Sequence, residues 1–211
     1  MITPGMTVEE TRDAFLALPI AHTLRSRLQE PWRSYHVWAH PMAMIERAIE
    51  AEREGVGIHD AAAVVGFCLW HDAVYDPTAQ HGRNEELSAL LCEAEMPEHA
   101  DRISVRAAAC ATRATTRHLL TDLATCPDMP LMLDIDLAIL GMDEEIFLAY
   151  EEGIHVEYAH VSPTVRRTVR TDILKRFLAR DRLYMTDWAH ARWEATARTN
   201  LKSSIRRMAA A

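Results

Sequence analysis

The sequence predicts an all-α protein, and three observations support this fold class. Only 7 of the 211 residues are glycine, and the residues that dominate, alanine, leucine, glutamate and arginine, favour helices. No segment alternates apolar and polar residues for long enough to predict a strand. Hydrophobic residues are 49% of the chain and charged residues 26%, as in ordinary globular proteins. This length suits a single domain over residues 1–211, with a helical bundle as its core.

Capping residues, prolines and glycines predict the elements in order. The capping-box pattern Thr7-Val8-Glu9-Glu10 starts the first helix, and Pro19 ends it. Pro97 is expected in the first turn of a later helix, and Gly141 at the end of another. The further helices are expected over residues 20–29, 33–54, 58–71, 84–95, 97–118, 130–140, 144–159, 163–181 and 188–208. Loops are expected over residues 73–83 and 121–129.

The net charge of −8 is unevenly distributed. Residues 163–211 hold 12 Lys and Arg against 4 Asp and Glu, a balance of +8, whereas residues 1–162 hold 11 against 27, a balance of −16. Two basic helices that pack on an acidic body account for this pattern, and contact with an anionic ligand or nucleic acid is the alternative. Because the overall charge is negative and no nucleic-acid-binding motif is present, we do not expect a nucleic-acid partner.

The sequence also predicts where the protein resides. No apolar run approaches the ~18 residues that a membrane span needs, so no membrane partner is expected. The N-terminal stretch MITPGMTVEETRDAF lacks the basic and apolar regions of a signal peptide. The cysteines are scattered and are expected to be free thiols: Cys68, Cys92, Cys110 and Cys126. We therefore expect a reducing, cytoplasmic location.

A histidine and an aspartate end the apolar segment GFCLWHD. The apolar residues carry this segment into the core, and His71 and Asp72 arrive there with it. A buried charge is costly unless it is paired or coordinates a metal. The pair therefore suggests a divalent cation, although the dipeptide alone is a weak signal.

Two further groups of polar residues lie in apolar surroundings. His36 and His40 are four residues apart, which on a helix places them on one face about 6 Å apart along the axis. The alternative is two core histidines bonded to carbonyl groups. Asp134 and Asp136 lie in the apolar segment LDIDLAILG, about 200° apart around a helix, so only one can face a given site. The alternative is that one caps the helix and the other is solvated.

The order of a histidine, a His-Asp pair and a distant aspartate resembles the HD superfamily of metal-dependent phosphohydrolases. The resemblance is closest to a bacterial group of predicted HD phosphohydrolases of unknown substrate, and it covers about residues 30–201. The shared segments are PWRSYHVWAH, HDAVYDP, RNEELSA, ATTRH, DIDLAILG, EY, FLARDRLY and ARTNL. The resemblance implies an HD-type helical bundle.

The segment YHVWAHPMAM also resembles the YHNxxHAxD segment of cyclic-nucleotide phosphodiesterases. There the second histidine binds metal and the first donates a proton to the leaving oxygen, which implies His40 as a ligand and His36 as an acid. The ADL motif of those enzymes aligns with Ile135-Asp136-Leu137, which leaves Asp134 as a helix cap or a support for a ligand. The implied metal ligands are His40, His71, Asp72 and Asp136.

Two imidazoles and two carboxylates suit one divalent ion: Mn, Fe, Co, Ni, Zn or Mg. Such an ion keeps open positions and lowers the pKa of water, and Asp72 can orient that water. Arg33 is either a phosphate clamp or part of a surface salt bridge. The expected function is therefore cleavage of a phosphomonoester or phosphodiester, with a nucleotide among the candidate substrates.

Four more residues carry open interpretations. Glu85, in an Asn-Glu pair shared with the bacterial group, holds a water or a ligand histidine, or is simply a first-turn helix acid. His118 matches a histidine of that group, and some HD proteins hold a second metal with histidines in this interval. Tyr75 lines the site or packs in the core. His155 stands where an arginine is expected, which leaves anion binding there in doubt.

Two other functions remain open. One is a non-catalytic HD module that binds metal or a nucleotide, and the other is a di-iron HD oxygenase, which requires His118 as a ligand. A homodimer is also open: Trp188 and Trp193 form either an exposed apolar face or part of the core.

Overall fold

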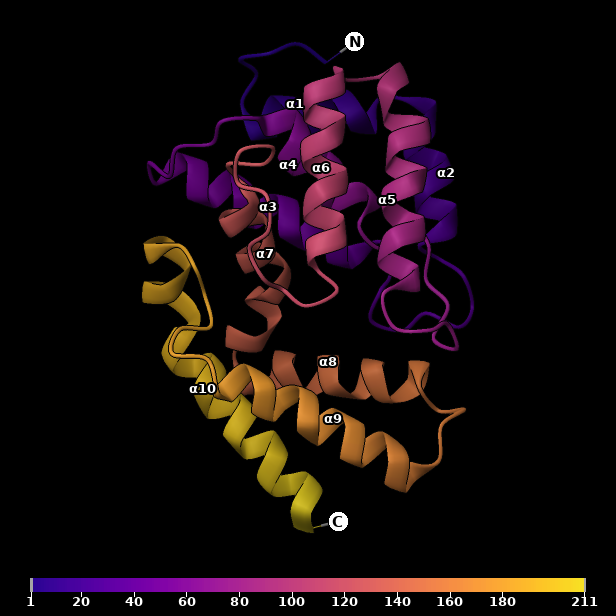
Figure 1. Cartoon of the computed structure of the whole chain (residues 1–211), viewed down its shortest axis with the longest axis vertical. Coiled ribbons are helices and arrows are strands. Elements are labelled where there is room, and N and C mark those ends of the chain that lie inside the picture. The colour runs from indigo at the N-terminus through magenta and orange to yellow at the C-terminus, as the bar shows by residue number, and fades with distance from the viewer. Residues whose placement is uncertain (1, 211) are drawn as a thin grey trace. The chain divides into compact units, whose positions relative to one another are not determined.

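The computed structural model describes residues 2–210, and within this range it contains helices and no strand, which confirms the all-α prediction. The contacts divide the chain into two compact units, with the boundary between Asp136 and Leu137 (Figure 1). The single domain over residues 1–211 stays a prediction. No helix within residues 2–210 combines the length and hydrophobicity that a membrane span requires.

Within its described residues, 2–136, the first unit contains seven α-helices and a short 3₁₀ helix. They are α1 (Val8–Leu16), α2 (Pro19–Arg27), α3 (Ala39–Arg53), α4 (Ala61–Trp70), α5 (Arg83–Glu95), η1 (Met96–Glu98), α6 (Arg102–Ala114) and α7 (Met129–Asp136). Helices α5 and α6 run side by side (Figure 1), and α4 packs against α1, α3, α5, α6 and α7. Residues 63–70 of α4 are all buried, as expected of a helix that is apolar all round.

The capping box places the start of α1 correctly, whereas α4, expected from residue 58, begins at Ala61. The Thr7 hydroxyl accepts from the Glu10 amide and the Glu10 carboxylate accepts from the Thr7 amide, so the predicted capping box is confirmed. Asp60 caps α4 by accepting from the Ala63 amide. The predicted helix start at Pro97 is wrong, because residues 96–98 form η1 and the Asp101 carboxylate instead caps α6.

The prediction of one helix over residues 33–54 is wrong in its first turns. Helix α3 begins only at Ala39, and a tight turn precedes it, in which the Val37 amide donates to the Tyr35 carbonyl at 2.7 Å. The Arg33 guanidinium donates to the His36 carbonyl, which ties this turn to the site described below. His36 and His40 therefore do not share a helix face, although their ring centroids are 6.2 Å apart.

The second unit contains η2 (Leu137–Gly141), α8 (Glu144–Glu157), α9 (Pro163–Leu178) and α10 (Asp187–Ala210). Helix α10 packs against η2 and α9, and the Asn200 side-chain amide donates to the carbonyls of Leu140 and Met142. Trp193 is buried and makes an edge-to-face contact with Trp188, with ring centroids 5.1 Å apart. This supports the core interpretation of Trp193.

Candidate metal centre

Two histidines and an aspartate converge in the first unit. His40 lies in the first turn of α3, His71 caps the C-terminus of α4, and Asp72 follows it. Within residues 2–210, these three form the group whose potential ligand atoms all lie within 4.8 Å of one another. The Nε2 atoms of His40 and His71 are 3.2 Å apart, and the Asp72 Oδ2 atom is 2.9 Å from the His71 Nε2 atom. The group is compact enough to hold one metal ion.

Asp136, the last residue of α7, contacts both histidines. Its Oδ1 atom lies 3.1 Å from the Nε2 atom of His40 and 3.6 Å from that of His71. The structure therefore brings together all four residues proposed as ligands. Two imidazole nitrogens and two carboxylates are a donor set that borderline divalent ions accept, so the residues present fit a metal ion.

Outer hydrogen bonds orient the two histidine rings. The His71 Nδ1 atom lies 3.1 Å from the Cys68 carbonyl oxygen, and the His40 Nδ1 atom lies 3.2 Å from the Tyr35 hydroxyl. Both rings therefore turn their Nε2 atoms toward the centre, and such partners commonly fix the tautomer of metal-binding histidines. Sequence reasoning missed this contact of Tyr35, because residues five apart have no fixed relation across an irregular turn.

The charges of the cluster stabilise one another. Burial lowers the pKa of His71, but the neighbouring Asp72 charge outweighs this and raises it to about 9. Burial opposes ionisation of Asp72 and Asp136, yet contacts with the surrounding histidines hold the pKa of each carboxyl below its ordinary value. Burial lowers the pKa of His40. Without metal, the cluster is thus a buried network of two carboxylates and a protonated His71.

Arg33 is buried, so the alternative of a surface salt bridge is wrong, and its role as a phosphate clamp stays a prediction. Its side chain is fully buried, and it donates to the Glu30 carboxylate at 2.9 Å and to the Asp72 carbonyl at 2.9 Å. It also donates to the carbonyls of His36 and Ala73. The guanidinium therefore joins the turn before α3 to the segment after α4. This geometry assigns Arg33 the positioning of His36 and Asp72, and it is not a surface salt bridge.

His36 lies at the edge of the cluster. Its ring is half-buried and stacks on Tyr75 with the centroids 4.3 Å apart, and Tyr75 is only 8% exposed. The ring centroid of His36 also lies 6.2 Å from that of His40. The proposed acid therefore stands beside the candidate ligands, with Tyr75 supporting its ring.

The remaining carboxylates lie outside the three-residue group. Asp134 is 1% exposed, so the idea that it is solvated is wrong. Glu85 lies half-buried in the first turn of α5, and no hydrogen bond or ion pair of its side chain occurs within the described range. Its alternative roles remain predictions.

His118 reaches the cluster from beyond the end of α6. Its Nε2 atom is 2.8 Å from the Oδ2 atom of Asp136, the oxygen that faces away from His40. Its backbone is left-handed, with φ of 48°, a conformation that is uncommon for a residue other than glycine and that recurs at functional sites. The expected helix over residues 97–118 ends at Ala114, and this left-handed turn aims His118 inward. His155, in contrast, contacts Arg166 in the second unit.

Comparisons with protein-family models, with curated proteins and with solved structures find no match for this chain.

Proposed function

We propose that the protein is a metal-dependent phosphohydrolase of the HD type. The observation that carries this proposal is the cluster of His40, His71 and Asp72, whose ligand atoms lie within 4.8 Å of one another, with Asp136 against both histidines. The order of these residues along the chain is also the order in which the HD resemblance expects them.

We assign the residues of the cluster and its surroundings separate roles in phosphoester cleavage. A divalent ion held by the four ligands would supply positive charge for the phosphoryl oxygens and acidify a water molecule. His36, whose ring lies 6.2 Å from that of His40 and stacks on Tyr75, is the residue to which we assign the donation of a proton to the leaving oxygen. Arg33 donates hydrogen bonds to the backbone carbonyls of His36 and Asp72, which fixes the position of the proposed acid relative to that of the metal ligand. The substrate class is a phosphomonoester or phosphodiester, including nucleotides, in the cytoplasm.

A second candidate rests on the 2.8 Å contact between His118 and Asp136. His118 and Asp136 would be the residues that hold a second ion, which would supply the additional positive charge of a two-metal phosphohydrolase or the second iron of a di-iron oxygenase. A His118→Ala variant separates the one-metal and two-metal proposals. If the metal content per chain is unchanged, the second ion is excluded; if it falls by about half, the two-metal site is supported.

The experiment is a hydrolysis assay with added Mn²⁺ on aryl phosphates, bis-aryl phosphates and a nucleotide panel. We expect His71→Ala and Asp72→Ala to lose activity while their circular dichroism stays helical. His36→Ala should keep its metal content and lose about 10²–10⁴-fold in kcat, the usual contribution of a general acid. His22→Ala, at an exposed position of α2, is the matched control.

Wild-type activity in both His71→Ala and Asp72→Ala would overturn the proposal. Nucleotide binding without turnover of any substrate in the panel would support the non-catalytic module instead.

A further inference from the structure

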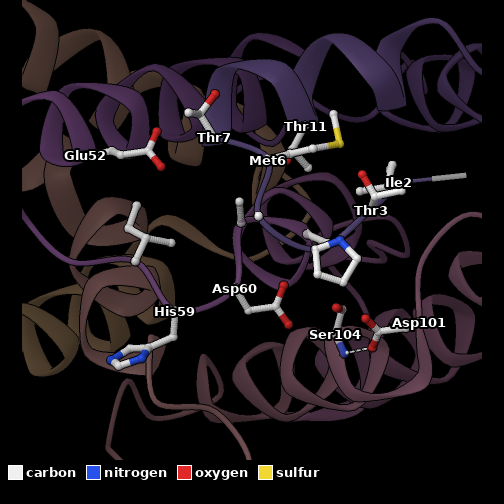
Figure 2. Close-up of a pocket in the computed structure, with 15 residues that line it drawn as sticks. Ile2, Thr3, Met6, Thr7, Thr11, Glu52, His59, Asp60, Asp101 and Ser104 are labelled. Atoms are coloured by element: carbon white, nitrogen blue, oxygen red, sulfur yellow. Dashed lines mark hydrogen bonds between the residues drawn. The ribbon is translucent and has the colours of Figure 1, made fainter.

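A cavity of about 320 Å³ lies in the first unit and shares no lining residue with the metal centre (Figure 2). Residues 2–7 form part of its wall, and the starts of α1, α4 and α6 form much of the rest. This volume is at the lower end of the range for small-molecule sites. The cavity is therefore large enough for a small organic ligand.

Three carboxylates line the cavity, and each has one oxygen engaged with a helix start. Glu52 accepts from the Val8 amide at 3.0 Å, Asp60 from the Ala63 amide at 2.9 Å, and Asp101 from the Ser104 amide at 2.9 Å. Within residues 2–210, none of the three forms an ion pair, and none donates or accepts through its second oxygen. The lining contains no lysine or arginine. The three carboxylates of the cavity thus form no ion pair within residues 2–210, although the His59 side chain also lines the cavity.

One buried hydroxyl group on the same wall, that of Thr11, lacks a partner, and the hydroxyl of Ser104 makes no hydrogen bond within residues 2–210. Thr11 is completely buried, and its Oγ1 atom has no hydrogen-bond partner among the described residues. Ser104 is 2% exposed, and its hydroxyl makes no hydrogen bond within the described range, although its backbone amide binds Asp101. Both residues line the cavity, and Ser104 stands beside Asp101 in Figure 2. Buried polar groups are nearly always hydrogen-bonded in proteins, so the buried Thr11 hydroxyl calls for a polar partner. The Ser104 hydroxyl is available to the same ligand.

We propose that this cavity binds a linear aliphatic amine that carries two or more ammonium groups. Each ammonium offers three donors and no acceptor, which matches carboxylates and hydroxyls that have accepting capacity to spare. The methylene stem between the ammonium groups would lie on apolar side chains of the lining such as Pro4, Ile58 and Ala62.

The spacing of the carboxylates favours such a ligand over a metal ion. Figure 2 shows Glu52, Asp60 and Asp101 spread across the cavity. In the described range, the group that meets the three-ligand spacing of 4.8 Å is the one at the metal centre, and these carboxylates do not meet it. An ion needs its ligands gathered around one point, whereas an extended diamine or triamine meets separated charges with separated ammonium groups.

The test is isothermal titration of the full-length protein with 1,4-diaminobutane and with spermidine. The variants Asp60→Asn and Asp101→Asn remove one charge each, and asparagine remains a good helix cap. Glu98→Gln, at an exposed position outside the cavity, makes the same charge change and is the matched control. Ser104→Ala removes a hydroxyl without changing the charge, and it tests the proposal if an aspartate variant does not fold.

We expect one site per chain, with binding about tenfold weaker in each aspartate variant, weaker in Ser104→Ala, unchanged in Glu98→Gln, and weakened by salt. Three results would overturn the proposal. They are no saturable binding of either amine, an equal loss in Glu98→Gln, which would indicate general attraction to an acidic protein, and displacement of the amine by Mg²⁺ at equimolar concentration.

Discussion

His71 is fixed at both of its ring nitrogens before any metal arrives. The Nδ1 atom lies 3.1 Å from the Cys68 carbonyl oxygen, one turn back in α4, and the Nε2 atom lies 2.9 Å from Asp72. The Tyr35 hydroxyl restrains the ring of His40 in the same way. The ligand atoms are thus preorganised, which reduces the reorganisation that metal binding requires.

Metal affinity should rise with pH in a defined range. Burial alone would lower the pKa of His71, but its interactions with Asp72 and Asp136 together have the larger effect and raise this pKa to about 9. The imidazole therefore carries a proton at neutral pH. A metal ion must displace that proton, and affinity should therefore increase by about tenfold per pH unit until the pH reaches about 9. Titration calorimetry with Zn²⁺ in buffers of different ionisation enthalpy measures the protons released. Affinity that is independent of pH, with no proton released, would contradict this account.

Glu194 should make stability depend on pH in the second unit. Burial raises the pKa of its carboxyl, but hydrogen bonds from the Leu183 and Tyr184 amides and the contact with Arg198 outweigh this and lower it. Since the pKa is lower in the folded state than in the unfolded state, the ionised carboxylate stabilises the fold above the unfolded value of about 4.5. This contribution is lost as the pH falls through the folded pKa.

We expect Glu194→Gln to lower the free energy of unfolding near pH 7 by about 1–3 kcal/mol, because charge-assisted hydrogen bonds are weakened. Urea unfolding of wild type and variant near pH 7 and near pH 3 measures the difference, which should shrink in acid. A difference that is equal at both pH values would show that the charge of Glu194 is not responsible.

At the scale of elements, local sequence signals determine where some helices begin, and long-range contacts determine where others begin. The cap Thr7 lies beside the helix that it starts, so this start could be read from the sequence. The start of α4, capped by Asp60, could be predicted only to within three residues. The start of α3 could not, because the turn before it is held by Arg33, whose other partners are carbonyls 39 and 40 residues away. Helix periodicity continues through residues 33–38 and does not reveal such a contact.

The same distinction applies to the candidate site. The polar pair at the end of an apolar segment marked His71 and Asp72, and the family resemblance suggested His40 and Asp136 as their companions. The contact of Tyr35 with His40 and the approach of His118 to Asp136 depend on irregular backbone, including a left-handed residue, which spacing rules do not describe. The directions of side chains outside regular helices could therefore not be predicted from the sequence.

Close packing of α10 on η2 depends on a glycine. A Cβ atom at Gly141 would lie 2.4 Å from the Cβ atom and 2.9 Å from the carbonyl oxygen of Trp193, well inside contact distance. Because the backbone of α10 would have to shift, Gly141→Ala should destabilise the protein by about 1–3 kcal/mol. Urea unfolding measures the loss, with Gly57→Ala as the control, since a Cβ there has open space. Equal stability of the two variants would show that η2 and α10 adjust without cost.

At the scale of the whole molecule, all candidate metal ligands lie in one of the two compact units of the chain. The candidate ligands and His36 belong to the first unit, and Asp136 is its last residue. The excess of basic residues over residues 163–211 belongs to the second unit, which contributes none of the candidate ligands. Metal binding should therefore stabilise the first unit specifically, because a ligand that binds only the folded state raises the free energy of unfolding.

The most informative single measurement is the metal content of the protein by elemental analysis, after purification without added metal or chelator. Wild type should contain about one transition-metal ion per chain, His71→Ala should contain little, and the exposed His22→Ala control should match wild type. About two ions per chain would support the two-metal site with His118. If neither wild type nor His71→Ala contains metal, and neither takes up Mn²⁺ or Zn²⁺ on titration, the cluster is not a metal centre.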